Sequence, residues 1–301
     1  MPARRFPGIH AVLYALFDQG ERLDRVAMRR QVTMCLEAGV DGIVVLGLAT
    51  EVAKLTEREQ RDLVRWAIDD VAGRVPVGVT VYGNSLVPQL ELMRTAEEAS
   101  ADWLILQPPA VGAFAGAEMI RTFGRLADAA SLPVAIQNAP ALMQRGLDVE
   151  AIAALVAAHP NITHLKGEIP VVQLAQVIEI CGDKLVVLNG QGGLEMIDSL
   201  RAGCGGFVLA PDIVDHAVRI WRRWQRGDTT GAEADYASLL PEIVFVMRSI
   251  EHLIAYGKRV FCLRAGLPVH DRAPCDRPTS FGLACADRYA AALGRFGLQP
   301  C

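Results

Sequence analysis

Lysine is scarce in this chain of 301 residues, because only four of its 30 basic residues are lysines and the others are arginines. Cysteine occurs seven times, but no two cysteines form a CxxC pair and none stands at ligand spacing from a histidine. An odd number of scattered thiols disfavours a disulfide framework, and the missing ligand patterns, HExxH included, disfavour a metal site. We therefore predict free cysteines in a reducing compartment and no metal.

Long hydrophobic runs are also lacking, since no segment approaches the roughly 18–20 apolar residues of a membrane span. The first residues, Met1–Pro7, lack the apolar core of a secretory signal, so we expect a cytoplasmic protein without a membrane partner. The formal net charge of −4 disfavours a nucleic-acid partner. With 51% hydrophobic and 21% charged residues, the composition is that of a globular protein with an ample core.

What the chain does contain is a regular alternation of strand and helix patterns. Eight short apolar segments have strand character: His10–Ala15, Gly42–Gly47, Pro76–Val81, Asp102–Leu106, Pro133–Ile136, Asn161–Leu165, Lys184–Leu188 and Gly206–Ala210. A helical pattern follows each of them: Asp24–Gly39, Thr56–Ala72, Val87–Ala99, Glu118–Ala130, Asp148–Ala158, Val171–Ile180, Glu195–Ala202 and Ile213–Gln225. Eight consecutive units of this kind predict an α/β fold, a (β/α)8 or TIM barrel.

A doubly wound open sheet is the alternative fold, but it would normally carry a glycine-rich phosphate turn after its first strand. No GxGxxG motif stands there and no Walker A motif occurs, so we predict no cofactor. The barrel is expected to span residues 1–226, and residues 227–301 are expected to form a helical extension packed on it. The extension's predicted helices are Ala232–Ala255, Lys258–Ala265 and Ser280–Phe296.

In a (β/α)8 barrel the chemistry lies at the carboxyl ends of the strands, so the residues that follow each strand are the candidates. They include Thr50, Tyr82, Gln107, Gln137, Lys166, Asn189 and Asp212. Lys166 is the only lysine in this set, and it ends an apolar strand, where an ammonium is costly unless something pairs or uses it. The functional interpretation is a Schiff-base nucleophile, and the alternative is a strand-end lysine that reaches solvent.

Two segments resemble the dihydrodipicolinate synthase and N-acetylneuraminate lyase superfamily of class I lyases. They are Gly47–Leu55 (GLATEVAKL), which is similar to that family's GTTGE turn, and the strand that ends on Lys166. Asp41-Gly42 and Asn189-Gly190 fit the same pattern, and the likeness runs from about residue 8 to the C-terminus. The resemblance implies that Lys166 condenses with the keto carbon of pyruvate or a larger 2-oxo acid. It also implies a homotetramer built from dimers.

Departures from the family pattern bear on the reaction. The family's YxxP motif is replaced by Gln137-Asn138-Ala139-Pro140, so the proton-relaying tyrosine is missing, and the synthase's second tyrosine falls around Pro109-Ala110. The two threonines of the turn become Leu48-Ala49. The arginine for a distal carboxylate falls near Leu142, with Arg145 out of register. These differences disfavour dihydrodipicolinate synthase activity, because function depends on the site and not on the fold.

The motif QxAP at Gln137, taken with KxE at Lys166, resembles 2-keto-3-deoxy-pentonate dehydratases, the L-2-keto-3-deoxyarabonate dehydratase branch. This likeness implies a lyase that dehydrates a 2-keto-3-deoxy sugar acid. Three alternatives stay open: a retro-aldolase that releases pyruvate from such an acid, dihydrodipicolinate synthase, and a non-catalytic protein of this fold that binds a 2-oxo acid.

The expected catalytic residues are Lys166, as the nucleophile at C2, and Glu168, as the general acid or base. Glu168 could instead be a glutamate that only favours the start of the next helix. Gln137 and Asn138 belong to the predicted substrate-binding residues. Their amides cannot titrate, so they could orient a hydroxyl or a water, or could only hold the loop that ends in Pro140.

The substrate's carboxylate is expected at the backbone N–H groups of Ala49 and Thr50, with the Thr50 hydroxyl assisting. Tyr82 is a possible replacement phenol, or an aromatic at a subunit contact. Asn189 and Gly190, which follow the seventh strand, complete the predicted substrate-binding set.

Overall fold

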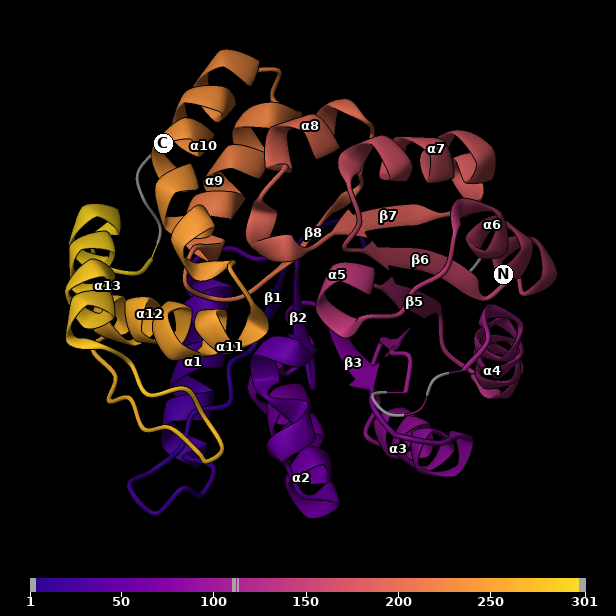
Figure 1. Ribbon diagram of the computed structural model, residues 1–301, viewed down its shortest axis with the longest axis horizontal. Coiled ribbons are helices and arrows are strands. Elements are labelled where there is room, and N and C mark those ends of the chain that lie inside the picture. The colour runs from indigo at the N-terminus through magenta and orange to yellow at the C-terminus, as the bar shows by residue number, and fades with distance from the viewer. Residues whose placement is uncertain (1–3, 110–111, 113, 298–301) are drawn as a thin grey trace.

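The computed structural model describes residues 4–109, 112 and 114–297, and its strands close into a parallel barrel (Figure 1). Neighbours in sequence pair in order, and the last strand pairs with the first. The strands are β1 (Gly8–Val12), β2 (Gly42–Val45), β3 (Val77–Val81), β4 (Trp103–Leu106), β5 (Val134–Asn138), β6 (Ile162–Gly167), β7 (Val186–Asn189) and β8 (Gly206–Leu209). The predicted (β/α)8 barrel is therefore confirmed. Ala110 and the last four residues of the predicted extension lie outside the described residues.

Several strands, among them the first and the seventh, differ in their bounds from the sequence prediction. β1 begins at Gly8 because its register with β8 starts at Gly206, and it ends at Val12, three residues before the predicted end. β7 begins only at Val186, since Gly182–Lys184 forms a single 3-10 turn before it. Gly182 has a φ of +52°, a left-handed value that glycine adopts without cost, so the turn is built where a strand was predicted.

Helices follow the strands and cover the outside of the barrel. They are α1 (Arg25–Glu37), α2 (Glu57–Val71), α3 (Leu86–Glu98), α4 (Gly116–Ala129), the short α5 (Pro140–Met143), α6 (Val149–Ala158), α7 (Val171–Cys181), α8 (Met196–Arg201) and α9 (Val214–Gln225). Side chains cap α1 and α2 at their N-termini: the Asp24 side chain accepts hydrogen bonds from two N–H groups of α1, and Thr56 and Glu59 make a complete capping box on α2.

The prediction of one long helix over Ala232–Ala255 is wrong. α10 (Thr229–Val246) ends one residue before Met247. The backbone of Ser249 is extended, and its side chain caps the short helix α11 (Ile250–His252) that follows. A π-helical turn over Leu253–Gly257 leads into α12 (Lys258–Ala265). The last helix, α13 (Ser280–Leu293), stops three residues before its predicted end because Gly294 takes a left-handed φ of +73°.

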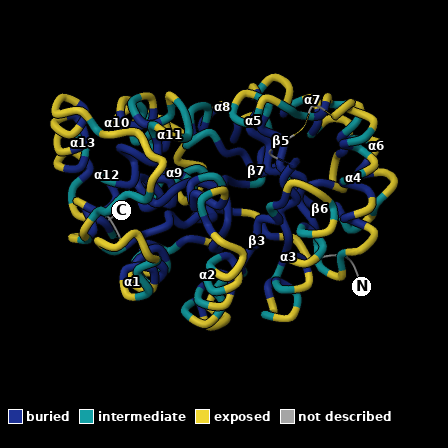
Figure 2. Tube along the Cα trace, turned by 60° about the horizontal axis from the view of Figure 1, so that its bottom comes forward, coloured by how far each residue is buried: buried dark blue, intermediate teal, exposed yellow. Residues whose placement is uncertain are grey.

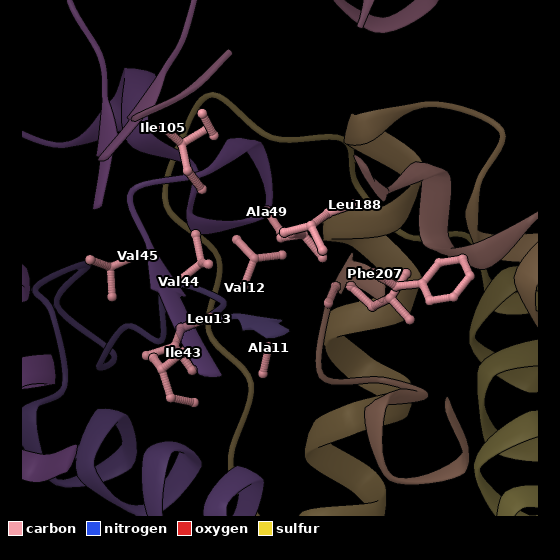
Figure 3. Packing of buried hydrophobic residues seen from close by; sticks show 14 of the residues in the cluster. Ala11, Val12, Leu13, Ile43, Val44, Val45, Ala49, Ile105, Leu188 and Phe207 are labelled. Carbon is pink, nitrogen blue, oxygen red and sulfur yellow. The ribbon is translucent and has the colours of Figure 1, made fainter. Parts of the chain in front are cut away.

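The C-terminal helices gather on one side of the barrel, where α10 packs against α8 and α9 and α12 packs against α13 (Figure 1). Buried chain is concentrated in the strands, and exposed chain lies on the outer helices (Figure 2). Figure 3 shows part of the core, with apolar side chains from β1, β2, β4, β7 and β8 close together. This packed interior holds the strand ends in fixed relative positions.

Aromatic and imidazole rings pack together in the half of the barrel that contains the strand starts. His164 stacks on Phe6 and lies 5.2 Å from the Trp103 ring, and His10 meets Trp103 edge-on. The backbone of Phe6 bonds both histidines, since its N–H donates to His164 Nε2 and its carbonyl lies 2.9 Å from His10 Nε2. Burial lowers the pKa of His10 to about 4 and that of His164 to about 3.

Candidate functional site

Lys166 lies next to last in β6, where its side chain is directed to the inside of the barrel mouth. The neighbouring position shows the direction: a Cβ on Gly167 would strike Leu174 of the outer helix α7, and successive side chains of a strand point to opposite faces. The residue register places Gln137 of β5 and Leu188 of β7 beside Lys166. Only 4% of Lys166 is exposed, so its amine is removed from bulk solvent.

Glu168 is the acidic partner of this lysine. One carboxylate oxygen, Oε2, lies 3.4 Å from Lys166 Nζ and accepts a hydrogen bond of 2.8 Å from Gln137 Nε2. The other oxygen faces the N–H of Gln191, which lies at 3.4 Å. The two catalytic residues predicted from the sequence are therefore brought together, with Gln137 as a shared neighbour. A carboxylate at this distance can exchange a proton with the amine.

A second lysine is buried near the mouth, but its amine is held by ion pairs within the protein. Lys258 of α12 has no exposed surface, and its Nζ lies 2.6 Å from Glu51 Oε1 and 5.3 Å from the centre of the Phe17 ring. The other oxygen of Glu51 pairs with Lys54 at 2.7 Å. Glu51 thus ties the turn after β2 to α12, and Lys258 serves as its structural partner there. Lys166 differs in its position, because it stands at a strand end on the inside of the barrel mouth, where the chemistry of this fold is located.

Two of the predicted binding residues act mainly within the scaffold. Asn138 forms two bonds to the Leu147 backbone, donating to its carbonyl at 3.0 Å and accepting from its N–H at 2.8 Å. The Asn138 carbonyl in turn accepts the N–H of Glu168. Asn189 likewise bonds Ser199 and the N–H of Gly190. These side chains fix the loops that carry Glu168, as the alternative interpretation of Asn138 allowed.

Gly190 leaves the space that the Glu168 carboxylate occupies. A Cβ at this position would lie 2.5 Å from Glu168 Oε1, which is well inside contact distance. The contact of Gly190 is thus with a catalytic candidate, and its role in binding substrate stays a prediction.

The turn after β2 is a short 3-10 segment, Leu48–Thr50, that lies at the barrel mouth. The N–H of Thr50 donates to the Gly47 carbonyl at 3.0 Å, and its hydroxyl donates to the Leu13 carbonyl at 2.6 Å. Both donors therefore have partners inside the protein. A substrate carboxylate bound through Ala49 and Thr50 stays a prediction, and help from the Thr50 hydroxyl would require it to leave Leu13.

A cavity of about 910 Å³ opens beside this turn. Tyr82 and Gln107, which follow β3 and β4, line it together with residues of α5, the Ile250–Ala255 segment and the stretch around Cys275. Lys166 is not among its described lining residues. The link to Lys166 is Gln137, which the strand register places between Gln107 and Lys166.

The structure adds residues that were not in the predicted site. Gln191 donates to the Glu168 carbonyl at 3.0 Å, and Gln107 lines the cavity. Tyr14 follows β1 and Asp212 follows β8, and the Tyr14 hydroxyl donates to the Asp212 carboxylate at 2.8 Å. Burial raises the pKa of Asp212 to about 6, and it also raises the pKa of its neighbour Glu242. Strand-end position pointed to Gln107 and Asp212, whereas Glu242 lies on a helix far along the chain and gave no sequence signal.

Among the residues that the structure describes, no group of three or more histidine, cysteine, aspartate or glutamate side chains is placed to hold a metal ion. The six described cysteines are free thiols. In the same part of the chain, no helix has both the length and the apolar character that a membrane crossing needs.

Comparison with known proteins finds related sequences that match most of the chain, including the barrel. A sequence profile described as the Dihydrodipicolinate synthetase family matches residues 5–274. YagE of Escherichia coli K12, provisionally named a 2-dehydro-3-deoxy-D-gluconate aldolase, is 29% identical over 244 residues, covering 78% of this chain and 80% of YagE. L-2-keto-3-deoxyarabonate dehydratase of Azospirillum brasilense is 28% identical over 245 residues and covers 79% of each chain. A 4-hydroxy-tetrahydrodipicolinate synthase of Methanopyrus kandleri is 28% identical over 243 residues, covering 77% and 78%.

Solved structures share the fold over nearly the entire chain. The crystal structure of YagE in complex with pyruvate has a TM-score of 0.88 and 26% identity, covering 96% of this chain and 99% of that one. A dihydrodipicolinate synthetase homologue from Pseudomonas aeruginosa has a TM-score of 0.90 at 22% identity, covering 96% and 100%. The relatives carry three different activities at almost the same identity, so the choice among them rests on the site.

Proposed function

This chain belongs to the dihydrodipicolinate synthetase family, and on that premise we propose that it dehydrates a 2-keto-3-deoxy sugar acid through a Schiff base on Lys166. The observation that carries the proposal is the position of Glu168. Its carboxylate lies 3.4 Å from the Lys166 amine and is held by Gln137, at the strand-five position where the family's proton-relaying tyrosine is missing. A carboxylate, rather than a phenol, is the group beside the lysine that can move protons.

The first steps would make the substrate an electron sink. Glu168 accepts a proton from the Lys166 ammonium, and the neutral amine attacks the C2 carbonyl of the 2-oxo acid. Glu168 returns this proton to the hydroxyl of the carbinolamine, which leaves as water and gives the iminium ion. The iminium draws electron density from C3 and acidifies its protons, and Glu168 is again a carboxylate.

The same carboxylate then serves in both halves of the elimination. Glu168 removes a proton from C3 to give the enamine, and the resulting acid passes that proton to the hydroxyl on C4. The C4–O bond breaks with departure of water, C3 and C4 become doubly bonded, and the iminium is restored. Transfer of a proton from C5 to C3 shifts the double bond to C4–C5, and the resulting enol tautomerises to an aldehyde at C5. Hydrolysis of the iminium frees Lys166 and releases this semialdehyde, which keeps every carbon atom of the substrate.

Aldol cleavage is the second candidate, because YagE, 29% identical to this chain, carries an aldolase name. It would use the same iminium but break the C3–C4 bond. Product analysis separates the two reactions. A dehydrated semialdehyde that retains all carbons supports the dehydratase, whereas pyruvate plus an aldehyde would replace it by the retro-aldolase. A 4-hydroxy-tetrahydrodipicolinate synthase would instead make product from pyruvate and aspartate semialdehyde.

The Glu168→Gln variant tests the assigned role directly. The amide keeps the size and the Gln137 contact but cannot carry the proton, so turnover should fall by roughly 10²–10⁴-fold. Borohydride should still trap pyruvate on Lys166, at least slowly, because the amine remains. Turnover within about twofold of the parent protein would remove Glu168 from the mechanism.

A further inference from the structure

Three polar side chains form a row that leads from the 910 Å³ cavity to Lys166. The register pairs Val81 with Leu106 and Leu106 with Ile136. Continued by one residue, it sets Tyr82, which follows β3, beside Gln107, which follows β4, and Gln107 beside Gln137 of β5. Gln137 is itself paired with Lys166. Directly paired residues of neighbouring parallel strands point to the same face, which is the inside of the mouth for Lys166. A substrate held on Lys166 would therefore extend along Gln137 toward Gln107.

Gln107 carries a buried acceptor without a partner. The residue is 1% exposed and lines the cavity, yet its Oε1 accepts no hydrogen bond from the described part of the chain. Its backbone is fixed, because the Gln107 carbonyl accepts a bond of 2.9 Å from Gln89 Nε2. A buried polar atom left unpaired is costly, so such an atom at a cavity wall indicates a ligand that pairs with it.

The charges of the cavity wall limit what that ligand can carry. Lys54 is bound to Glu51 at 2.7 Å, and Arg145 donates to the carbonyls of Pro109 and Gly112 at 2.7 and 2.8 Å. Both cations among the described lining residues are thus engaged by the protein. Glu251 and Asp276 line the same cavity and add negative charge. A second anionic group on the substrate would meet repulsion here and no available cation in the described wall.

We propose that Gln107, with Tyr82 beside it, binds a hydroxyl at the distal end of the substrate, and that this end carries no charge. The inference rests on the proposed function, because it assumes a 2-oxo acid anchored on Lys166. The expected substrate is then a sugar acid whose only anionic group is the C1 carboxylate and whose other end is an alcohol. Acids that end in a phosphate or a second carboxylate are excluded.

Borohydride trapping measures this selectivity without requiring turnover, because reduction captures the iminium whether dehydration or cleavage would follow. The probes are pyruvate, a 2-keto-3-deoxypentonate, a terminally phosphorylated 2-keto-3-deoxyhexonate and a 2-keto-3-deoxy acid with a second terminal carboxylate. We expect the two probes that carry a second anionic group to need at least about tenfold higher concentration for half-maximal initial trapping than the pentonate, which ends in an alcohol.

The Gln107→Met variant isolates the amide, since it keeps the length of the side chain and removes its polar atoms. Half-maximal trapping of the pentonate should require about tenfold more ligand, the effect of one buried hydrogen bond, while trapping of pyruvate stays unchanged. Gln173→Met, on the exposed part of α7, makes the same exchange outside the cavity and should alter neither value.

Two results would overturn the inference. The first leaves the proposed function standing, and the second refutes the proposed function as well. Equal trapping of all four probes by the parent protein and by Gln107→Met would refute the distal site and leave the Schiff-base proposal intact. Failure of every probe to label Lys166 would remove the proposed function and this inference together.

Discussion

At the scale of single residues, the candidate site depends on the contacts that position the Glu168 carboxylate beside Lys166. Lys166 at the end of β6, Gln137 at the end of β5 and Gln191 after β7 each approach its carboxylate, and Gly190 leaves the space for it. The sequence marked Lys166 and Glu168 because lysine is scarce and the two stand two positions apart. It did not reveal which contacts hold Glu168, because most of these come from the ends of two other strands, β5 and β7.

The Gly190→Ala exchange tests this arrangement. The new methyl group would lie 2.5 Å from Glu168 Oε1, so the carboxylate must leave the position that it holds beside Lys166 and Gln137. We expect turnover to fall at least about tenfold while pyruvate trapping persists, the pattern of a misplaced proton carrier. Gly116→Ala is the matched control, because a Cβ there meets nothing within 4 Å. Equal activity in the two variants would contradict the role given to Gly190.

At the scale of elements, the long connections that shape the mouth were the hardest to predict. Strand and helix order followed from apolar runs and caps such as Asp24 and Thr56, which act locally. The π-helical turn after Ser249 and the short helix at Pro140 depend on packing over the mouth, which periodicity alone does not encode. The pair between Glu51 and Lys258 joins two such elements, 207 residues apart in the chain.

Removing Lys258 from this pair should destabilise the fold. Lys258→Met leaves the Glu51 carboxylate buried with only Lys54 beside it, and breaking a buried pair costs about 3–5 kcal/mol. The free energy of unfolding, measured in urea, gives the value. Lys184→Met makes the same exchange on the surface and should stay within about 0.5 kcal/mol of the parent. A loss no larger in Lys258→Met than in Lys184→Met would show that the pair contributes little.

At the scale of the whole molecule, the barrel was predictable because each of its eight units repeats the same pattern in sequence. Closure also brings together groups that no local pattern connects, such as His10 of β1 and His164 of β6, which share the Phe6 backbone. Their pairing arises only when distant strands meet around one core. It should govern how the protein responds to acid.

Stability should fall as the pH drops below about 6.5, the ordinary pKa of histidine. Burial lowers the pKa of His10 to about 4 and of His164 to about 3, so in this interval the unfolded chain binds protons that the folded chain excludes. Each histidine then removes about 1.4 kcal/mol of stability for every pH unit. Urea unfolding at pH 7, 6 and 5 measures the slope.

A double variant, His10→Gln with His164→Gln, should flatten this dependence, since glutamine can offer a polar atom to the Phe6 backbone but does not titrate. His270→Gln, at a partly exposed position, serves as the control and should keep the parent's slope. An unchanged slope in the double variant would mean that other groups cause the loss of stability in acid.

The account depends most on a covalent bond between Lys166 and a 2-oxo acid. Borohydride reduction in the presence of pyruvate or a 2-keto-3-deoxypentonate, followed by peptide mass spectrometry, shows which of the four lysines is modified. We predict one adduct, on Lys166, that disappears in Lys166→Ala and remains in Lys258→Met. No adduct with either acid, or an adduct that survives in Lys166→Ala, would contradict the Schiff-base mechanism.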